Sequence, residues 1–155
     1  LIEIFHKLAH INCNLLFVGS GPDYSSLKAA IDKFNLGARI QLLGYREDAA
    51  ELIAKSHCFL LPSLREGLPL VILESALCKV PIIISSQSIS NTLIGKNDGY
   101  VTDLADFENA MLEVINNYDN ARMKAEKFYF KVKQNYSLES CIQSHEHLYS
   151  KIANE

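Results

Sequence analysis

The sequence predicts an α/β fold: a doubly wound, mostly parallel, Rossmann-like sheet with helices on both faces, followed by a helical tail. Short apolar runs alternate with stretches that have the period of amphipathic helices. The runs lack in-and-out alternation, which is typical of parallel strands buried on both faces. From Asp106 onward only helical patterns remain. Because parallel strands need crossover connections, we expect the helices between the runs to cover both faces of the sheet.

Each expected strand is a short apolar segment that ends near glycine, proline or a polar residue. The five segments are 14–18, 39–43, 57–61, 81–85 and 99–102. The helical patterns between them are 2–10, 23–34, 47–55 and 68–78. Gly37 is the predicted stop signal of the second helix.

The tail is expected to hold three helices: one from Phe107 to Ile115, one over 121–134, and one that follows Ser137. Ser137 is a plausible N-cap, because its hydroxyl can accept a hydrogen bond from a first-turn amide. Apolar residues recur along one face of the last helix, from Cys141 to Ile152. We expect this face to pack on the sheet domain.

The composition bounds the class of protein. The 155 residues are expected to form one domain, 1–155. The net charge is −3 without a run of Lys or Arg, which argues against a nucleic-acid partner. No apolar stretch approaches the roughly 20 residues of a membrane span, and no signal peptide is present. Four scattered cysteines without a CxxC pair favour buried free thiols in a reducing compartment, so we expect a cytoplasmic location.

The chemically informative segment is 62–76, PSLREGLPLVILESA, which holds Glu66 and Glu74 eight positions apart. If a helix begins near Leu68, Glu66 lies in the loop before it. Glu74 then lies about 9 Å along the helix axis from that start. The two acids would therefore reach different parts of one extended ligand.

The expected helix start is also an anion site, because its unpaired N–H groups and positive dipole end favour a phosphate group. Gly67 allows close approach of the backbone. Pro69 has no N–H, so the expected donors are Leu68, Leu70 and Val71. Carboxylates suit the paired hydroxyls of sugars. The pattern indicates a ligand with hydroxyls at one end, then a diphosphate, then a ribose.

This segment resembles the signature of glycosyltransferase family four, retaining enzymes with the GT-B fold whose C-terminal domain carries a Glu-x7-Glu motif. The match has Ser75 where the family has alanine. Other family-like segments surround it at matching distances, and Lys79 replaces a glycine in the third of them. These segments are LLFVGSGP, IQLLGY, CKVPIIIS and NDGYV. The resemblance covers nearly the whole chain and implies the donor-binding domain of such an enzyme.

The resemblance implies roles for the matching residues. Glu66 matches the catalytic glutamate that contacts the hydroxyls of the donor sugar near the reacting carbon. Glu74 matches the glutamate that holds the ribose. The backbone of 67–71, with Gly67, Leu68, Leu70 and Val71, matches the diphosphate site.

Two further loops are assigned in the same way. Tyr45 and Arg46 match the region beside the nucleobase, and Gly19 and Gly21 match a turn that borders the donor cleft. The resemblance implies no metal and no cofactor, since the nucleotide sugar is a substrate, and the sequence holds no Asp-x-Asp pair.

The resemblance also shows what this chain lacks. The family's first strand in this domain, its diphosphate-neutralising Arg and Lys, and the N-terminal acceptor domain would lie before Leu1. Thr92 stands where the family has a glutamate. We therefore expect this chain alone to bind nucleotide weakly and to transfer no sugar. Exposed strand edges would favour a strand-mediated dimer.

The full-length enzyme is expected to transfer a hexose from UDP- or GDP-sugar to a glycan or lipid-linked acceptor, with peripheral association at the inner face of the membrane. Two other classes stay open: a GT-B-fold UDP-sugar epimerase and a non-catalytic nucleotide-sugar-binding module. Without the resemblance, Glu66 could be a helix N-terminal acid and Glu74 a solvated helix residue. Tyr45 and Arg46 could equally be plain surface residues.

Overall fold

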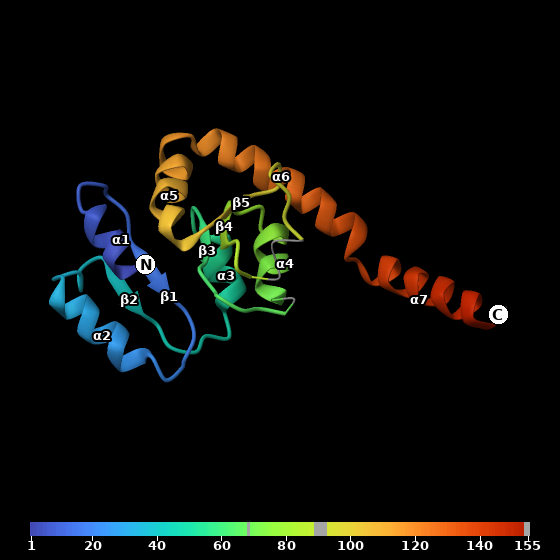
Figure 1. Cartoon of the computed structure of the whole chain (residues 1–155), viewed down its shortest axis with the longest axis horizontal. Helices are drawn as coiled ribbons and strands as arrows, with labels where there is room; N and C mark the ends of the chain where they lie inside the picture. Colours follow the sequence, from blue (N-terminus) through green and yellow to red (C-terminus); the bar gives the residue numbers. More distant parts are fainter. Residues whose placement is uncertain (68, 89–92, 154–155) are drawn as a thin grey trace. The chain divides into compact units, whose positions relative to one another are not determined.

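The computed structural model describes residues 1–67, 69–88 and 93–153 (Figure 1). The chain divides into two compact units, Leu1–Glu51 and Leu52–Glu155. The short helix α3, Ala49–Ala54, crosses from the first unit into the second.

The first unit is built on two parallel strands. Its elements are α1 (Ile2–Lys7), β1 (Leu15–Phe17), α2 (Tyr24–Lys33) and β2 (Ile40–Leu42). In the sheet Leu15 lies beside Ile40 and Phe17 beside Leu42. The guanidinium of Arg39 contacts the segment between α1 and β1 and α1 itself. It donates to the carbonyl of Ile11 at 2.6 Å and lies 4.7 Å from the Phe5 ring centroid.

Helix α2 ends at a left-handed residue, as expected, but this residue is Asn35 and not Gly37. Asn35 has φ 55°. The amide of Asn35 donates to the carbonyl of Asp32 at 3.1 Å and that of Leu36 donates to Ile31 at 3.0 Å, the two bonds of a Schellman motif. Asparagine tolerates this conformation better than other side chains, so the left-handed residue lies two positions before the glycine that was predicted to end the helix.

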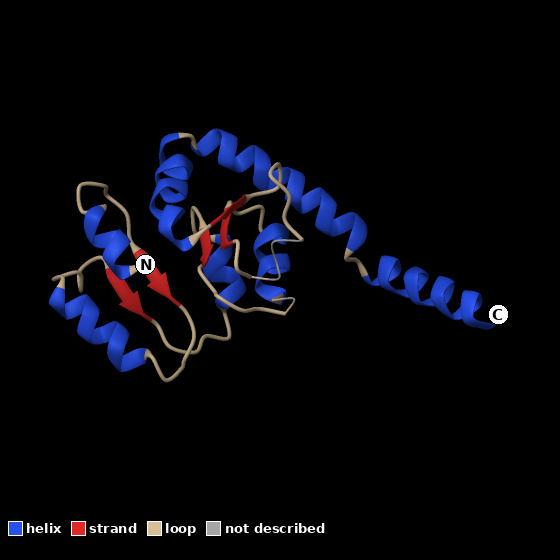
Figure 2. Cartoon of the chain, in the orientation of Figure 1, coloured by secondary structure: helices blue, strands red, loops and turns tan. Residues whose placement is uncertain are grey.

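The second unit contains three parallel strands in the order β3-β4-β5 (Figure 2). Its strands are β3 (Phe59–Leu61), β4 (Ile82–Ser85) and β5 (Tyr100–Thr102). Its helices after α3 are α4 (Leu70–Leu77), η2 (Leu104–Asp106), α5 (Phe107–Asn116), α6 (Tyr118–Asn135) and α7 (Leu138–Ala153). The parallel pairing in both units confirms the predicted α/β class, although the described strands form two sheets.

The central strand β4 is buried along its whole length, which is why its sequence, IIIS, is almost entirely apolar. Its side chains belong to a cluster that joins α4, the segment before β5, and α6. The buried members are Ile72, Ala76, Ile82, Ile84, Leu93, Ile94, Phe128 and Val132. Helix α4 packs on this cluster through Ile72 and Ala76.

Helix α4 ends in the same way as α2. Lys79 has φ 54°, and the amides of Lys79 and Val80 donate to Ala76 at 2.9 Å and to Ser75 at 3.1 Å. The position is left-handed, which is the physical reason for the glycine of the family pattern. The other departure, Ser75, is fully buried, and its hydroxyl donates to the carbonyl of Ile72 at 2.8 Å. It therefore adds no unpaired polar group.

The prediction that the apolar face of the last helix packs on the sheet domain is wrong. Ser137 does cap α7, because its hydroxyl accepts the amide of Ser140 at 3.1 Å. However, no described side chain of α7 is buried, and Leu138 is 75% exposed and Ile152 61% exposed. A periodic apolar face indicates that a helix can bury a stripe, but it does not say that the partner lies in the same unit. None of the described helices combines the length and apolar character that a membrane span requires.

The cysteines are free thiols, as predicted, but they are less buried than expected. Cys13, Cys58 and Cys78 are half-buried, and Cys141 on α7 is exposed.

Candidate functional site

The candidate site of the second unit begins where β3 ends. Because β3 and β4 are parallel, the loops that follow them leave the sheet at the same carboxyl edge, the usual ligand-binding edge of such sheets. Glu66 lies in the loop after β3 and is half-buried. Gly67 is exposed, and a Cβ built there meets no atom within 4 Å. Packing within the described protein therefore does not require glycine at this position.

Helix α4 begins at Leu70, two residues later than predicted, and Leu68 lies outside the described residues. Pro69 is the N-cap in an extended conformation, without a side-chain capping bond. Leu70 and Val71 are the first two residues of the helix, so their N–H groups precede the intrahelical ladder. The first turn of α4 thus offers two amides at the positive end of the dipole, close in sequence to Glu66.

Glu74 lies one turn inside α4 on its exposed stripe. It is flanked by Leu70 and Leu77, which are 67% and 53% exposed. Burial, and secondly the carboxylate of Glu74, raise the pKa of the Cys78 thiol one turn further on. Glu74 is itself exposed, so its carboxylate lies on the solvent side of the helix, where a ligand could reach it.

In the first unit, the structure brings the predicted glycine turn and the nucleobase loop together. The amide of Gly19 donates to the carbonyl of Gly44 at 2.7 Å. Both glycines follow parallel strands and have positive φ, 130° for Gly19 and 66° for Gly44. Gly21 accepts the amide of Tyr24 at 3.3 Å, and Tyr45 is 74% exposed beside Gly44.

Arg46 is engaged by its own loop. Its Nε and one terminal nitrogen donate to the two carboxylate oxygens of Asp48 at 2.7 and 2.6 Å. This hydrogen-bonded contact with Asp48 raises the pKa of the Arg46 guanidinium. A ligand phosphate would have to compete with Asp48 for this cation.

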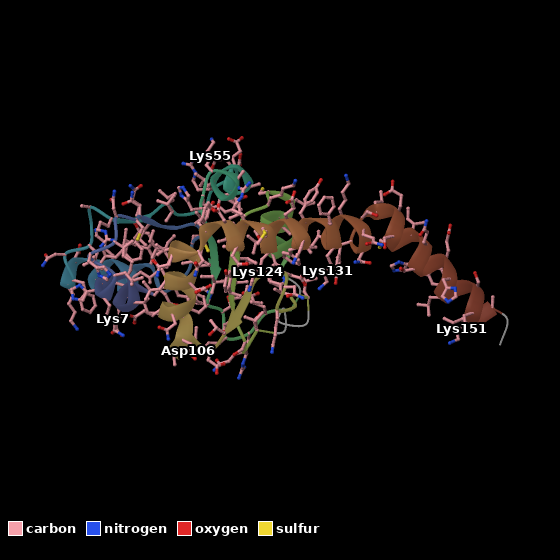
Figure 3. All side chains as sticks on the ribbon, turned by 90° about the horizontal axis from the view of Figure 1, so that it is seen from above. Lys7, Lys55, Asp106, Lys124, Lys131 and Lys151 are labelled. Carbon is pink, nitrogen blue, oxygen red and sulfur yellow. The ribbon has the colours of Figure 1, made fainter. Side chains whose placement is uncertain are left out.

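Polar contacts that the sequence reasoning did not single out lie on α6. Lys131 contacts both Asp98 and the carbonyl of Leu93, and Lys124 contacts the carbonyl of Lys96. Figure 3 labels both lysines on α6. The spacing of seven residues between the two lysines was the available signal, since it places both on one face of a helix. Among the described residues no group of three or more His, Cys, Asp or Glu side chains could hold a metal ion. Metal-independent chemistry stays a prediction.

Residues 1–130 match the family model described as glycosyl transferases group 1. The UDP-Gal:alpha-D-GlcNAc-diphosphoundecaprenol alpha-1,3-galactosyltransferase of Escherichia coli is 38% identical over 104 residues, which cover 64% of this chain and 27% of that protein. The N-acetyl-alpha-D-glucosaminyl L-malate synthase of Bacillus anthracis is 25% identical over 154 residues, which cover 96% of this chain and 40% of that protein.

Solved structures show the same fold. The Anabaena protein HepE in complex with UDP superposes with a TM-score of 0.88 at 19% identity, covering 97% of this chain and 44% of that chain. Sucrose-phosphate synthase from Thermosynechococcus elongatus has a TM-score of 0.82 at 22% identity, covering 99% of this chain and 42% of that chain. The chain spans less than half the length of each of these four proteins. These matches confirm the resemblance stated from the motifs.

Proposed function

The chain belongs to the glycosyl transferases group 1 family, and from that premise we propose that it is the donor-binding, C-terminal part of a retaining glycosyltransferase. The full-length protein transfers a hexose from UDP- or GDP-sugar to a glycan or lipid-linked acceptor. One observation carries the proposal: Glu66 lies in the loop after β3, directly before the uncapped start of α4, at the carboxyl edge of a parallel sheet. Names of two relatives support a lipid-linked acceptor, since both include diphosphoundecaprenol or diphospho-undecaprenol.

In this proposal the diphosphate of the donor lies at the start of α4. The amides of Leu70 and Val71 donate to its oxygens, and the helix dipole stabilises its negative charge. Pro69 makes no side-chain capping bond at this position. Gly67, and Leu68 by its place in the motif, complete the backbone that receives the phosphates. The same contacts stabilise the charge that develops on the leaving diphosphate.

Two carboxylates hold the ends of the donor. Glu66 accepts hydrogen bonds from hydroxyls of the sugar near the reacting carbon, and it is the proposed catalytic residue. Glu74, which faces solvent on α4, accepts hydrogen bonds from the ribose hydroxyls. By their match to the family motifs, Gly19 and Gly21 are proposed as donor-binding residues of the first unit, and Tyr45 and Arg46 as its nucleobase-binding residues.

Charge supports the further proposal that this chain alone is inactive. Two acids face an anionic donor, and Arg46 is already paired with Asp48. We propose that the full-length enzyme supplies further cations, a further strand and the acceptor site. Among the described residues β1 pairs only with β2 and β3 only with β4, so in the isolated chain their free edges favour a strand-mediated dimer. We place the full-length enzyme in the cytoplasm, at the inner face of the membrane, without a metal cofactor.

The decisive experiment uses the full-length protein. Glu66→Ala should abolish most turnover, whereas Glu74→Ala should mainly raise the donor KM, since it removes binding made in ground state and transition state alike. Near-normal kinetics in both variants would refute the assignment of these acids. Incubation with UDP-sugar alone separates the alternatives, because an epimerase releases an altered UDP-sugar and a binding module leaves it unchanged.

The isolated chain gives a second test. Calorimetric titration with UDP and GDP should show only weak binding. Sub-micromolar affinity or measurable transfer by this chain would contradict the proposed inactivity.

A further inference from the structure

We propose that Lys131, supported by Lys124, is a positioning residue of the donor site. It locks segment 93–100 onto the apolar cluster that seats α4, the helix that carries Glu74 and the Leu70 and Val71 amides. The inference rests on the proposed function and adds residues of α6, far from the motif in sequence, to the machinery of that site.

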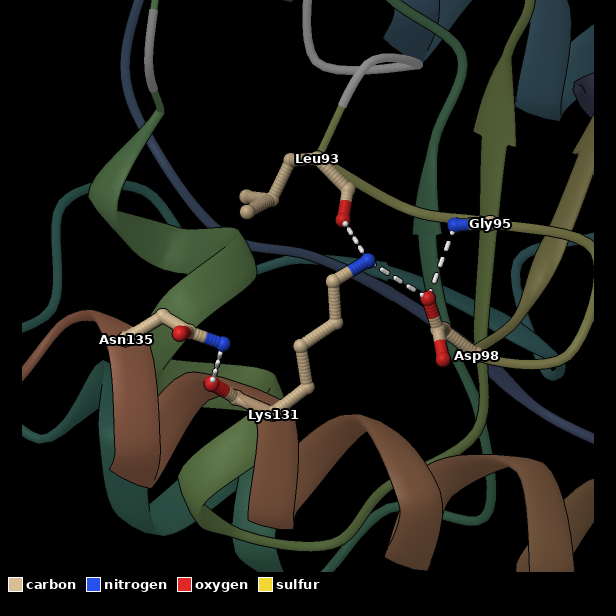
Figure 4. Close-up of polar contacts among 5 residues, drawn as sticks. All are labelled: Leu93, Gly95, Asp98, Lys131 and Asn135. Atoms are coloured by element: carbon tan, nitrogen blue, oxygen red, sulfur yellow. Dashed lines mark hydrogen bonds and ion pairs between the residues drawn. The ribbon is translucent and has the colours of Figure 1, made fainter.

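The contacts of Lys131 tie together three points of one segment (Figure 4). Its Nζ donates to the carbonyl of Leu93 at 2.9 Å and contacts Oδ2 of Asp98 at 2.7 Å. The same Oδ2 accepts the amide of Gly95 at 2.9 Å. The Asp98 side chain is only 14% exposed, so water solvates its carboxylate poorly. The Lys131 ammonium compensates for this lost solvation.

Lys124 makes a second attachment two turns earlier on α6. Its Nζ donates to the carbonyl of Lys96 at 3.1 Å and lies 4.1 Å from the ring centroid of Tyr100. Lys124 and Lys131 therefore hold both halves of segment 93–100 from the same face of one helix (Figure 3). An ammonium suits this role because it carries three donors and can satisfy a carbonyl and a carboxylate together.

Apolar packing connects this segment to α4. Leu93 and Ile94 belong to the cluster that contains Ile72 of α4 and Phe128 of α6. Helix α6 thus supports α4 through its buried face and segment 93–100 through its lysines. Because close-packed interiors transmit displacements, releasing the segment shifts the neighbours of Ile72 and with them the start of α4.

The test compares Lys131→Met with Lys127→Met in the full-length protein. Lys127 is exposed on the same helix, so its substitution removes the same charge without the contacts. Calorimetry with UDP and with GDP, and the donor KM, provide the functional readout. We expect Lys131→Met to weaken nucleotide binding and raise the donor KM about tenfold, with kcat changed about threefold or less. Lys127→Met should leave all three values unchanged.

Two further variants separate positioning from general stability. Lys131→Arg should restore most of the affinity, and Asp98→Asn should weaken binding without adding to the effect of Lys131→Met. If Lys131→Met does not fold, Lys124→Met should still weaken nucleotide binding, although it loses only the contacts with Lys96 and Tyr100. Wild-type affinity in whichever of these Met variants folds would overturn the inference.

Hydrogen exchange distinguishes failure of the positioning role of Lys131 from failure of the proposed function. Lys131→Met should speed amide exchange in α4 and in segment 93–100, whereas Lys127→Met should not. If the wild-type protein binds neither UDP nor GDP, the proposed function fails, and the exchange of α4 still decides whether Lys131 positions it. Unchanged exchange in α4 would overturn the positioning role by itself.

Discussion

The amide of Gly19 donates a 2.7 Å hydrogen bond to the carbonyl of Gly44, which joins the loops that follow the two parallel strands of the first unit. Both residues have positive φ, and a Cβ at either position meets no atom within 4 Å. The constraint on both glycines is therefore the backbone conformation and not space.

Alanine at these positions should destabilise the protein through the backbone alone. Gly44→Ala places an alanine in the left-handed well and should lower the free energy of unfolding by about 1 kcal/mol. Gly19, at φ 130°, lies outside that well, so Gly19→Ala should cost more, on the order of 1–3 kcal/mol. Urea unfolding measures both. Gly21→Ala is the control, because Gly21 has no positive φ and open space around its Cβ; equal losses in all three variants would contradict the explanation.

Lys79 is a second test of backbone strain, since a lysine occupies a left-handed position with φ 54°. Its ammonium lies 4.6 Å from the Tyr129 ring centroid and 3.5 Å from the Glu126 carboxylate. Lys79→Gly and Lys79→Ala both lose these contacts, but only glycine relieves the strain. We expect the glycine variant to be more stable than the alanine variant by about 1 kcal/mol in thermal or urea unfolding. An alanine variant as stable as the glycine variant would show that position 79 is not strained.

The apolar cluster around β4 predicts a contrast between two phenylalanines of α6. Phe128 is fully buried and Phe130 is 58% exposed. Phe128→Ala should lower the free energy of unfolding by about 3–5 kcal/mol, because it leaves a cavity against α4 and β4. Phe130→Ala on the same helix should change it by about 0.5 kcal/mol. Similar losses in both variants would mean that the cluster does not stabilise this unit.

The cysteines predict a pH dependence at alkaline pH. Burial of its thiol raises the pKa of Cys58 from 9.0 to about 12, although the residue keeps some exposed surface. Since the folded-state pKa is the higher one, the contribution of Cys58 to stability is complete below pH 9.0. It is lost as the pH rises toward about 12, because only the unfolded chain can ionise there.

The measurement compares the wild type with Cys58→Ala between pH 8 and pH 11. The difference in their free energies of unfolding should shrink as the pH rises, and a constant difference would contradict the raised pKa. Independently, a thiol reagent at pH 8 should modify the exposed Cys141 of the native protein and leave Cys58 unmodified until the chain unfolds.

Local signals were sufficient for much of this fold and for part of the site. Strand 14–18 became β1, Leu15–Phe17, and the helical period of 68–78 became α4, Leu70–Leu77. Glu66 was placed correctly in the loop before this helix, because a Gly–Leu–Pro sequence after an apolar run indicates a loop that leads into a helix start. The end of α2 was predicted to within one residue, but its left-handed stop is Asn35 and not Gly37, since asparagine as well as glycine can occupy this position.

By itself, the sequence determined the order of helices and strands, their parallel α/β class and the family motif, because periodicity, caps and short motifs act over a few residues. The tertiary structure alone decided that α7 buries none of its described side chains and that Lys131 reaches Asp98, 33 positions away. These outcomes depend on how separate elements pack and on which side chains compete for one partner. A pattern of a few neighbouring residues does not determine contacts between elements that lie far apart in the sequence.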